Sequence, residues 1–306
     1  MKNFHSTAND KIKQARVAER ILWWIAFAAI LIWSVTLIYS LFWMVASSFK
    51  DSLDYHINRF GLPDFEFATL DNYSISFKKL YVTVYKNGAS RNVEFFELLF
   101  NSLYITFVSA FVSVFVPSIV SYVTVKYDFG FNKVLNFIVV VSIVVPLSSS
   151  IASSLQIFRT FRVYDNMLIG VIVMRWSFLG MNFLYMAGAF RGIPNDYKEA
   201  AEIDGAGHFT ILFKIMLPMI KNIFLMFFLL QIISWWNTWD FTYIYMPTHP
   251  NLAQAVYNIQ FSFDNELVVK PVQLATCIIV ILPSLAIFCC FKNQIMQQVS
   301  FGGLKG

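Results

Sequence analysis

Long apolar stretches separated by short polar segments dominate the pattern of this chain. Each stretch has about 20 residues or more, the length at which an α-helix crosses the hydrocarbon core of a bilayer. The first one is too long and begins too late for a signal-peptide core, and it lacks a small-residue cleavage site. The pattern therefore predicts an all-α polytopic membrane protein with six transmembrane helices, at about 21–45, 98–125, 134–157, 167–190, 219–239 and 272–291.

The distribution of Lys and Arg predicts how these helices are oriented, because basic residues are enriched in short cytoplasmic loops. The arm 1–20 carries five basic residues, which favours a cytoplasmic N-terminus. With six spans, the segment 191–218 and the tail 292–306 are then cytoplasmic as well. The stretches 46–97 and 241–270 become external loops of a transmembrane domain that extends over residues 21–291. Arg159 and Arg162 oppose the rule.

Composition agrees with this class of protein. Of the 306 residues, 58% are hydrophobic and 13% are charged, about half the charged fraction of soluble chains. The net charge of +5 is spread without a long basic run, so we expect a lipid bilayer and no nucleic acid as partner. The cysteines share one apolar stretch and imply no disulfide framework. The four histidines have no metal-ligand spacing, and we expect no metal.

The external loop 46–97 is too short for an independent catalytic domain. Its aromatic residues Tyr73, Phe77, Tyr81 and Tyr85 recur at a spacing of four. That spacing predicts either an amphipathic helix on the membrane surface or an ordinary surface helix.

The cytoplasmic segment 191–218 has readable helix signals. Asn195 is a candidate N-cap, and the acidic residues after it suit the positive end of a helix. Gly205 is expected to end that helix in a left-handed turn, and a second short helix at about 209–216 leads to Pro218. Ala200 lets another backbone come close, while Glu199 offers a carboxylate beside it. We therefore expect a helix-turn-helix that docks another protein.

The same segment carries a spaced pattern: Glu-Ala-Ala, three residues, Gly, nine residues, then Ile-x-Leu-Pro. It resembles the signature loop of permease subunits of binding-protein-dependent ABC importers. Three further motifs make the chain similar to the smaller membrane subunit of maltose-type importers: Leu70 to Tyr73, Asn101 to Leu103, and the ending Gly303 to Gly306. The residues that the resemblance assigns to coupling with an ATPase are Glu199, Ala200, Ala201, Asp204, Gly205, Ile215, Leu217 and Pro218.

The resemblance implies a division of labour. Two permeases pair around a translocation path in a bacterial plasma membrane, two ATPase subunits bind beneath them, and an external solute-binding protein delivers the solute. This chain lacks the Gly-x-x-x-x-Gly-Lys-Ser/Thr phosphate loop. We therefore expect it to be no enzyme and to bind no cofactor, with ATP and Mg²⁺ held by the ATPase subunits. The stretch 79–94 looks inserted relative to the family, and no function is assigned to it.

Polar groups at bilayer depth are costly unless they face protein or water, so they mark candidate positions along the path. Aromatic rings can stack on the C–H faces of sugars, and amides can hydrogen-bond their hydroxyls. An aromatic belt at the membrane surface explains the tryptophans equally well, and a snorkelling side chain explains Arg175. The candidate path residues are Arg175, Asn182, Gln231, Trp235, Trp236, Asn237, Trp239 and Asp240.

The resulting hypothesis is a permease subunit of an ATP-driven importer for a carbohydrate, in particular an oligosaccharide. One alternative keeps the machinery and changes the solute to glycerol phosphate or another polyol. A phosphate would need several cationic groups in the path, and Arg175 stands nearly alone. A secondary transporter would need inverted repeats or broken helices at the midplane, which the sequence does not indicate.

Overall fold

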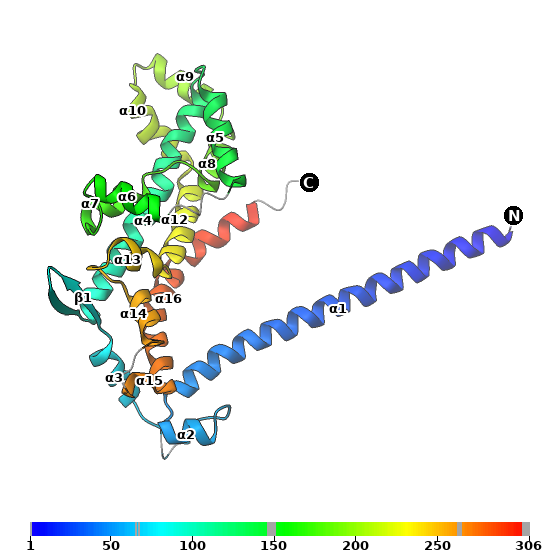
Figure 1. Cartoon of the computed structure of the whole chain (residues 1–306). Coiled ribbons are helices and arrows are strands. Elements are labelled where there is room, and N and C mark those ends of the chain that lie inside the picture. The colour runs from blue at the N-terminus through cyan, green and yellow to red at the C-terminus, as the bar shows by residue number, and fades with distance from the viewer. Residues whose placement is uncertain (1, 65, 67, 146–150, 262–264, 302–306) are drawn as a thin grey trace. The chain divides into compact units, whose positions relative to one another are not determined.

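The computed structural model of the protein describes residues 2–64, 66, 68–145, 151–261 and 265–301, with described side chains lying between residues 19 and 291. Its elements are labelled in Figure 1. The chain forms two compact units. The first contains residues up to Ser76 together with Asn265–Ala275, and the second contains Phe77–Asp264 and the chain from Thr276 onwards.

The first unit contains α1 (Lys2–Ser48), α2 (Ser52–Ile57), most of α3 (Asp71–Lys79), α15 (Asn265–Val268) and the beginning of α16 (Lys270–Phe301). The side chains of α1 between residues 19 and 42 are all exposed. The buried Asn72 amide donates to the carbonyls of Ser48 and Lys50, each at 2.8 Å. Asn72 therefore binds the end of α1 to the start of α3, which explains an asparagine at this place in the sequence.

The second unit is built around α4 (Phe95–Lys126), against which α8 (Met181–Arg191) and α12 (Lys221–Trp236) pack. Buried side chains of Tyr122, Phe190 and Met216 belong to one core cluster, and those of Leu98 and Trp236 to another. The remaining helices of this unit are α5 (Asn132–Val144), α6 (Ile151–Thr160), α7 (Met167–Arg175), α9 (Asp196–Ile203), α10 (His208–Thr210), the π-helix η1 (Ile211–Met216), α11 (Leu217–Met219), α13 (Asp240–Tyr245) and α14 (Leu252–Ile259).

Three helices among the described residues are long and apolar enough to cross a membrane: Glu19–Ser48 of α1, all of α4, and Lys270–Phe291 of α16. A fourth candidate is the pair His208–Met219 and Lys221–Trp236, which meet at a bend of 76°. The predicted third span is divided between α5 and α6, and residues 146–150 between them lie outside the described residues, as does the ending Gly303 to Gly306. The count of six spans stays a prediction.

The fourth predicted span differs from the single helix expected over 167–190. α7 ends at Arg175 and α8 begins at Met181. Gly180, which precedes α8, has a φ of +108°, a conformation incompatible with a continuous right-handed helix. The helix is therefore interrupted inside an apolar stretch, an arrangement that membrane proteins tolerate where surrounding protein or water satisfies the freed backbone groups.

The helix expected through Tyr81 and Tyr85 is wrong. α3 ends at Lys79, and the chain continues as an antiparallel hairpin of β1 (Val82–Lys86) and β2 (Ala89–Val93). Three consecutive β-branched residues, Val82 to Val84, favour a strand, and an Asn-Gly pair favours a two-residue hairpin turn. Asn87 and Gly88 adopt the positive φ values of +52° and +82° that such a turn requires. These signals are present in the sequence and outweigh the helical spacing of the tyrosines.

Candidate functional site

The segment 191–218 folds as two helical pieces joined at a glycine. Gly205, just after α9, has a φ of +77°, a left-handed conformation that glycine adopts at little cost. The Gly205 N–H donates to the Glu202 carbonyl at 3.1 Å, and the Ala206 N–H donates to the Ala201 carbonyl at 2.9 Å. These bonds satisfy carbonyls at the end of α9, as in a glycine-terminated helix. The turn predicted at Gly205 is confirmed.

One face of this segment is open to solvent. Glu199, Ala200 and Asp204 are exposed, as expected for a docking surface. Ile203 and Phe209 are also exposed, by 86% and 79%. Sequence reasoning missed these two apolar residues, although their place on either side of the Gly205 turn was the signal that could have found them.

The other face packs into the second unit. Ala201 is buried in the same cluster as Met216, and the half-buried Ile215 and Leu217 pack against that cluster. Pro218 is exposed at the start of α11. The spaced pattern therefore combines residues of two kinds, those that face outward and those that hold the segment in place.

The end of α4 anchors this segment. The Lys126 ammonium donates to Asn195 Oδ1 at 2.9 Å and to the Ile193 carbonyl. The Tyr127 hydroxyl shares a hydrogen bond of 3.0 Å with His208 Nδ1. Asn195 precedes α9 as predicted, but its side chain makes no capping hydrogen bond, because its oxygen accepts from Lys126 instead. Direct hydrogen bonds therefore join the end of α4 to the residues before α9 and to α10.

Arg175 lies at the end of α7, between two aromatic rings. Its guanidinium carbon is 4.0 Å from the ring centroid of Trp235 and 4.1 Å from that of Phe241. Such cation–π contacts are worth roughly 2 kcal/mol where they are desolvated. Arg175 Nε and Trp235 Nε1 are both buried and have no hydrogen-bond partner within the described part of the chain. The guanidinium therefore packs against two aromatic rings, and the path role of Arg175 stays a prediction.

The other candidate path residues of α7–α8 and α12 have different surroundings. The Asn182 amide donates to the Ser113 carbonyl at 2.8 Å and so joins α8 to α4. Gln231 is half-buried on α12, and Asp240 is exposed in the first turn of α13. The bond to Ser113 gives Asn182 a role in packing. No described contact brings Asn182, Gln231 and Asp240 together, and their assignment to the path stays a prediction.

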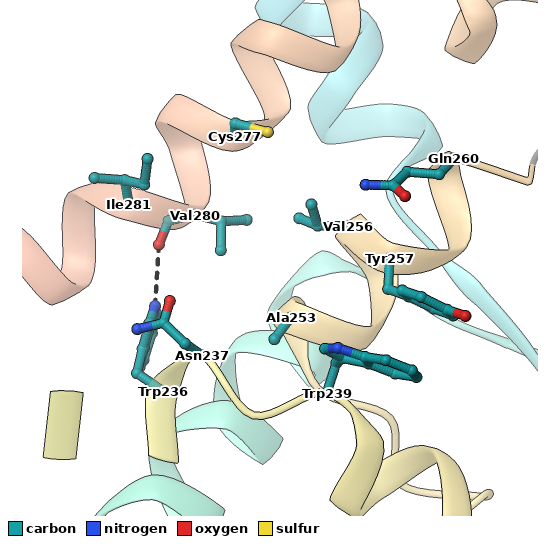
Figure 2. A pocket seen from close by; sticks show the side chains of 10 residues that line it. All are labelled: Trp236, Asn237, Trp239, Ala253, Val256, Tyr257, Gln260, Cys277, Val280 and Ile281. Carbon is teal, nitrogen blue, oxygen red and sulfur yellow. Dashed lines mark hydrogen bonds between the residues drawn. The ribbon is translucent and has the colours of Figure 1, made fainter. Parts of the chain in front are cut away.

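A cavity of about 300 Å³ lies where α12 ends, beside α14 and α16 (Figure 2). Three of the predicted path residues line it: Trp236, Asn237 and Trp239. Trp236 is only 3% exposed, and its indole N–H donates to the Val280 carbonyl at 3.2 Å. The Trp239 ring stacks on Tyr257, with centroids 3.7 Å apart and planes inclined by 8°. The structure thus separates these residues from Trp235, which contacts Arg175 instead.

The chain between α13 and α14 is fastened to the start of α4 and to the loop before α7. Asn101 donates to the Pro250 carbonyl at 2.8 Å, and the Ser102 hydroxyl accepts from the Leu252 N–H at 2.8 Å. Asn101 and Ser102 belong to a motif noted in the sequence, and this contact shows what the motif does. It places α14, and with it Tyr257, beside the cavity.

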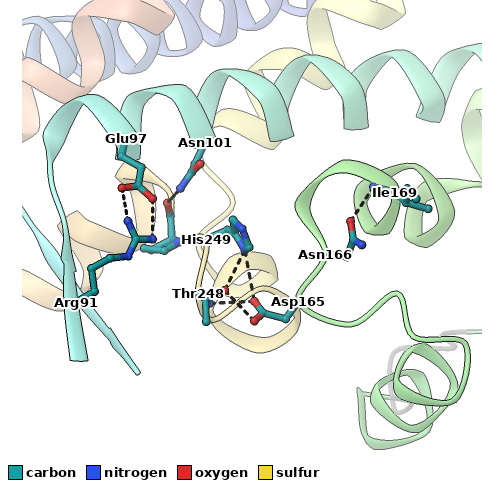
Figure 3. Close-up of polar contacts among 9 residues, drawn as sticks. Arg91, Glu97, Asn101, Asp165, Asn166, Ile169, Thr248 and His249 are labelled. Carbon is teal, nitrogen blue, oxygen red and sulfur yellow. Dashed lines mark hydrogen bonds and ion pairs between the residues drawn. The ribbon is translucent and has the colours of Figure 1, made fainter. Parts of the chain in front are cut away.

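A second set of polar contacts supports the same loop (Figure 3). Asp165 accepts from the Thr248 N–H at 3.0 Å and from the Thr248 hydroxyl at 2.8 Å, and it lies 3.5 Å from His249 Nδ1. Burial alone would raise the pKa of Asp165, but the hydrogen bonds from His249 and Thr248 lower it below its ordinary value. The ionised carboxylate is therefore the form that holds this loop.

Residues 89–294 match the protein family described as "Binding-protein-dependent transport system inner membrane component". The chain belongs to this family. The matched range begins in β2 and includes α9, the Gly205 turn and most of α16. The resemblance drawn from the spaced pattern around Glu199 is confirmed, and the chain is the inner-membrane component of such a transport system.

Two relatives are similar to this chain over most of its length. The diacetylchitobiose uptake system permease protein of Streptomyces coelicolor is 23% identical over 290 residues, which cover 91% of this chain and 87% of that protein. The arabinooligosaccharides transport system permease protein of Bacillus subtilis is 24% identical over 278 residues, which cover 89% and 92%. Both relatives are named as permease proteins, and both are aligned over most of their own length.

A solved structure shares the fold. It is a chain from the crystal structure of a bacterial ABC transporter involved in the import of the acidic polysaccharide alginate. The TM-score is 0.72 at 19% sequence identity, and the alignment covers 90% of this chain and 97% of that chain. This likeness shows that the helices described here form a transporter permease fold.

Proposed function

We propose that this permease component imports a carbohydrate, in particular an oligosaccharide. The observation that carries the proposal is the similarity, over about nine-tenths of the chain, to permeases named for diacetylchitobiose and for arabinooligosaccharides. The cavity in Figure 2 agrees with such a solute, because stacked aromatic rings and amide groups line it together.

The complete importer would contain a second, related permease, two ATPase subunits and an external solute-binding protein. ATP and Mg²⁺ would bind in the ATPase subunits, while this chain binds neither and catalyses no reaction. The family description supports a separate binding protein. The sequence, which has no phosphate-binding loop motif, supports a separate ATPase.

The proposed topology has six spans with both termini in the cytoplasm. α1, α4, α12 and α16 each supply one span, α5 with α6 supplies the third, and α7 with α8 supplies the fourth. The basic arm 1–20 and the basic residues of 191–218 support this orientation. Ser90→Cys and Glu202→Cys, each in a chain whose three native cysteines are replaced with serine, test it: a membrane-impermeant maleimide applied to intact spheroplasts should label the first variant and leave the second unlabelled.

The exposed face of 191–218 is the proposed docking surface for an ATPase subunit. Glu199 and Asp204 supply charge, Ala200 permits close approach, and Ile203 and Phe209 supply apolar area. Closure of the ATPase subunits on binding ATP would displace α9. Because Lys126 holds Asn195, the displacement would reach α4 and shift the balance between inward-facing and outward-facing states.

Two alternatives, a different solute and a different mechanism, have less support. Glycerol phosphate would need cations converging on the path, and the buried Arg175 is engaged with the rings of Trp235 and Phe241. The helix break at Gly180 is a feature found in secondary transporters, but such a transporter would leave the family match unexplained.

The test is uptake by the complete complex reconstituted in liposomes. Radiolabelled diacetylchitobiose, arabinotriose, raffinose and glycerol 3-phosphate are supplied with the binding protein, with and without internal ATP. ATP-dependent uptake of a sugar is the expected result. Uptake of glycerol 3-phosphate alone would contradict the proposed carbohydrate solute. Uptake of any compound without ATP would contradict the proposed ATP-driven mechanism.

A further inference from the structure

The cavity at the end of α12 is lined by groups of two chemical kinds. The first kind is indole and phenol rings: Trp239 stacks on Tyr257 at 3.7 Å, and the hydrogen bond to the Val280 carbonyl fixes the orientation of Trp236. Rings fixed in this way lose little conformational freedom when a ligand binds. These rings are therefore preorganised for a flat apolar surface.

The second kind is amide groups with unused hydrogen-bonding capacity. Asn237 Nδ2 donates to the Ile233 carbonyl at 2.8 Å, but its oxygen has no described partner in this part of the chain. The side-chain amide of Gln260 makes no hydrogen bond to any described residue, and both side chains are exposed at the cavity. Amide groups with free donors and acceptors close to fixed rings favour a ligand that presents both hydroxyls and C–H faces.

The amide groups that line the cavity argue against a lipid acyl chain as the occupant. A hydrocarbon chain would fill the apolar part around Val256 and Ile281, but it would leave the amides of Asn237 and Gln260 unpaired in an apolar environment. Unpaired polar groups in such surroundings are costly. A sugar ring can contact both kinds of group at once, because its hydroxyls bind the amides while its C–H groups contact the aromatic rings.

We propose that this cavity is a binding site for one sugar ring of the transported carbohydrate, formed by this chain alone from α12, α14 and α16. The proposal rests on the carbohydrate solute proposed above. Asn237 and Gln260 would hydrogen-bond ring hydroxyls, and Trp239 would contact a ring face. Tyr257 acts as a positioning residue, since it holds the Trp239 indole in place.

Cys277 offers a direct reporter of occupancy. Its half-buried thiol lines the same cavity, on α16. The other two cysteines, Cys289 and Cys290, are exposed and do not line it, so replacing both with serine leaves Cys277 as the one alkylation site in this chain. Mass spectrometry of this chain then reports the rate of N-ethylmaleimide addition without any reference to transport.

The experiment uses the complete complex and has two steps. The first identifies which sugar of the panel above stimulates ATP hydrolysis and is taken up. The second measures alkylation of Cys277 with that sugar at increasing concentration, against glycerol 3-phosphate and against lauryldimethylamine oxide, a detergent without a sugar group, as an acyl-chain probe. We expect saturating sugar to slow the alkylation severalfold, and the other two compounds to have no such effect.

Variants separate binding from folding. Gln260→Ala and Asn237→Ala should each raise the sugar concentration for half-protection by roughly 3- to 10-fold, the effect expected for one hydrogen bond. Asn258→Ala is the matched control for Gln260→Ala. It removes an amide from the last turn of α14, two residues before Gln260, at a position that does not line the cavity.

Each outcome decides between the two proposals. If no sugar is transported, the carbohydrate solute is wrong and this site fails with it. If a sugar is transported but leaves the alkylation of Cys277 unchanged, or protects both amide variants as well as the parent, the solute stands and the site is wrong. Protection by the detergent with none by the transported sugar would assign the cavity to lipid.

Discussion

The segment 191–218 and the cavity beside Trp236 are built in opposite ways. The segment is one continuous stretch whose turn, at Gly205, is closed by hydrogen bonds between neighbours in sequence. The cavity joins α12, α14 and α16, and its lining residues extend from Trp236 to Ile281. A docking surface that touches a partner needs a rigid local shape, whereas a solute site needs groups that converge from several sides.

This difference decides what a substitution does in each region. In the segment, a change at an exposed residue such as Glu199 alters the docking surface and leaves the core untouched. Around the cavity, a change at Trp236 also removes a member of the buried cluster shared with Leu98 and Leu252. Binding and stability can be separated in the first region and are combined in the second, except at exposed cavity residues.

The largest effect is expected from Glu199→Lys. Charge reversal on the exposed face of α9 should misplace the ATPase subunit, since like charges across an interface cost several kcal/mol. We expect transport and solute-stimulated ATP hydrolysis by the reconstituted complex to fall to background, with the permease still inserted in the membrane. Glu94→Lys, an exposed charge reversal on the predicted external side, is the control and should retain both activities.

Gly205→Val tests whether the shape of the turn matters. Valine at a φ of +77° is strained by about 1–2 kcal/mol, although a Cβ there would meet no atom within 4 Å. The variant should insert normally and lose coupled ATP hydrolysis. Gly207→Val is its match, since Gly207 has a φ of −73° and equally open surroundings. Equal activity of the two variants at the parental rate would remove the turn from the coupling mechanism.

Trp236→Ala and Asn237→Ala should differ in their effects on stability and on uptake. Trp236 is buried and hydrogen-bonded, whereas Asn237 is exposed at the cavity. Truncation of Trp236 should cost about 3–5 kcal/mol of stability and reduce the yield of assembled complex. Asn237→Ala should lower uptake while the melting temperature stays unchanged. Identical melting temperatures for both variants would contradict the burial of Trp236.

The smallest effect is expected from Asp165→Asn, which tests the loop that carries α14 to the cavity. Because the folded-state pKa of Asp165 is lowered, its contribution is fully present above the unfolded pKa of about 3.9 and is lost as the pH falls through the folded value. The melting temperature should drop modestly at pH 7. The difference between the parent and this variant should shrink on acidification, and a difference independent of pH would refute the assignment.

Sequence reasoning was most reliable where the physics is local. Apolar length indicated α1, α4 and α16, and the glycine at 205 indicated a left-handed turn. The helix expected from Tyr73 onwards is present as far as Lys79. The prediction was wrong beyond that residue, where two local signals competed and Asn87 and Gly88 form a hairpin turn. The interruption before Gly180 was also missed, because apolar content by itself does not distinguish one helix from two short ones.

The sequence by itself determined the class of protein, the family, and the local conformation of the segment around Glu199 and Gly205, since each depends on composition or on residues within one or two helical turns. Only the tertiary structure decided that Arg175 lies between Trp235 and Phe241, and that Trp239 stacks on Tyr257. Those contacts join helices far apart along the chain. Their geometry follows from how the helices pack, which no local pattern of residues specifies.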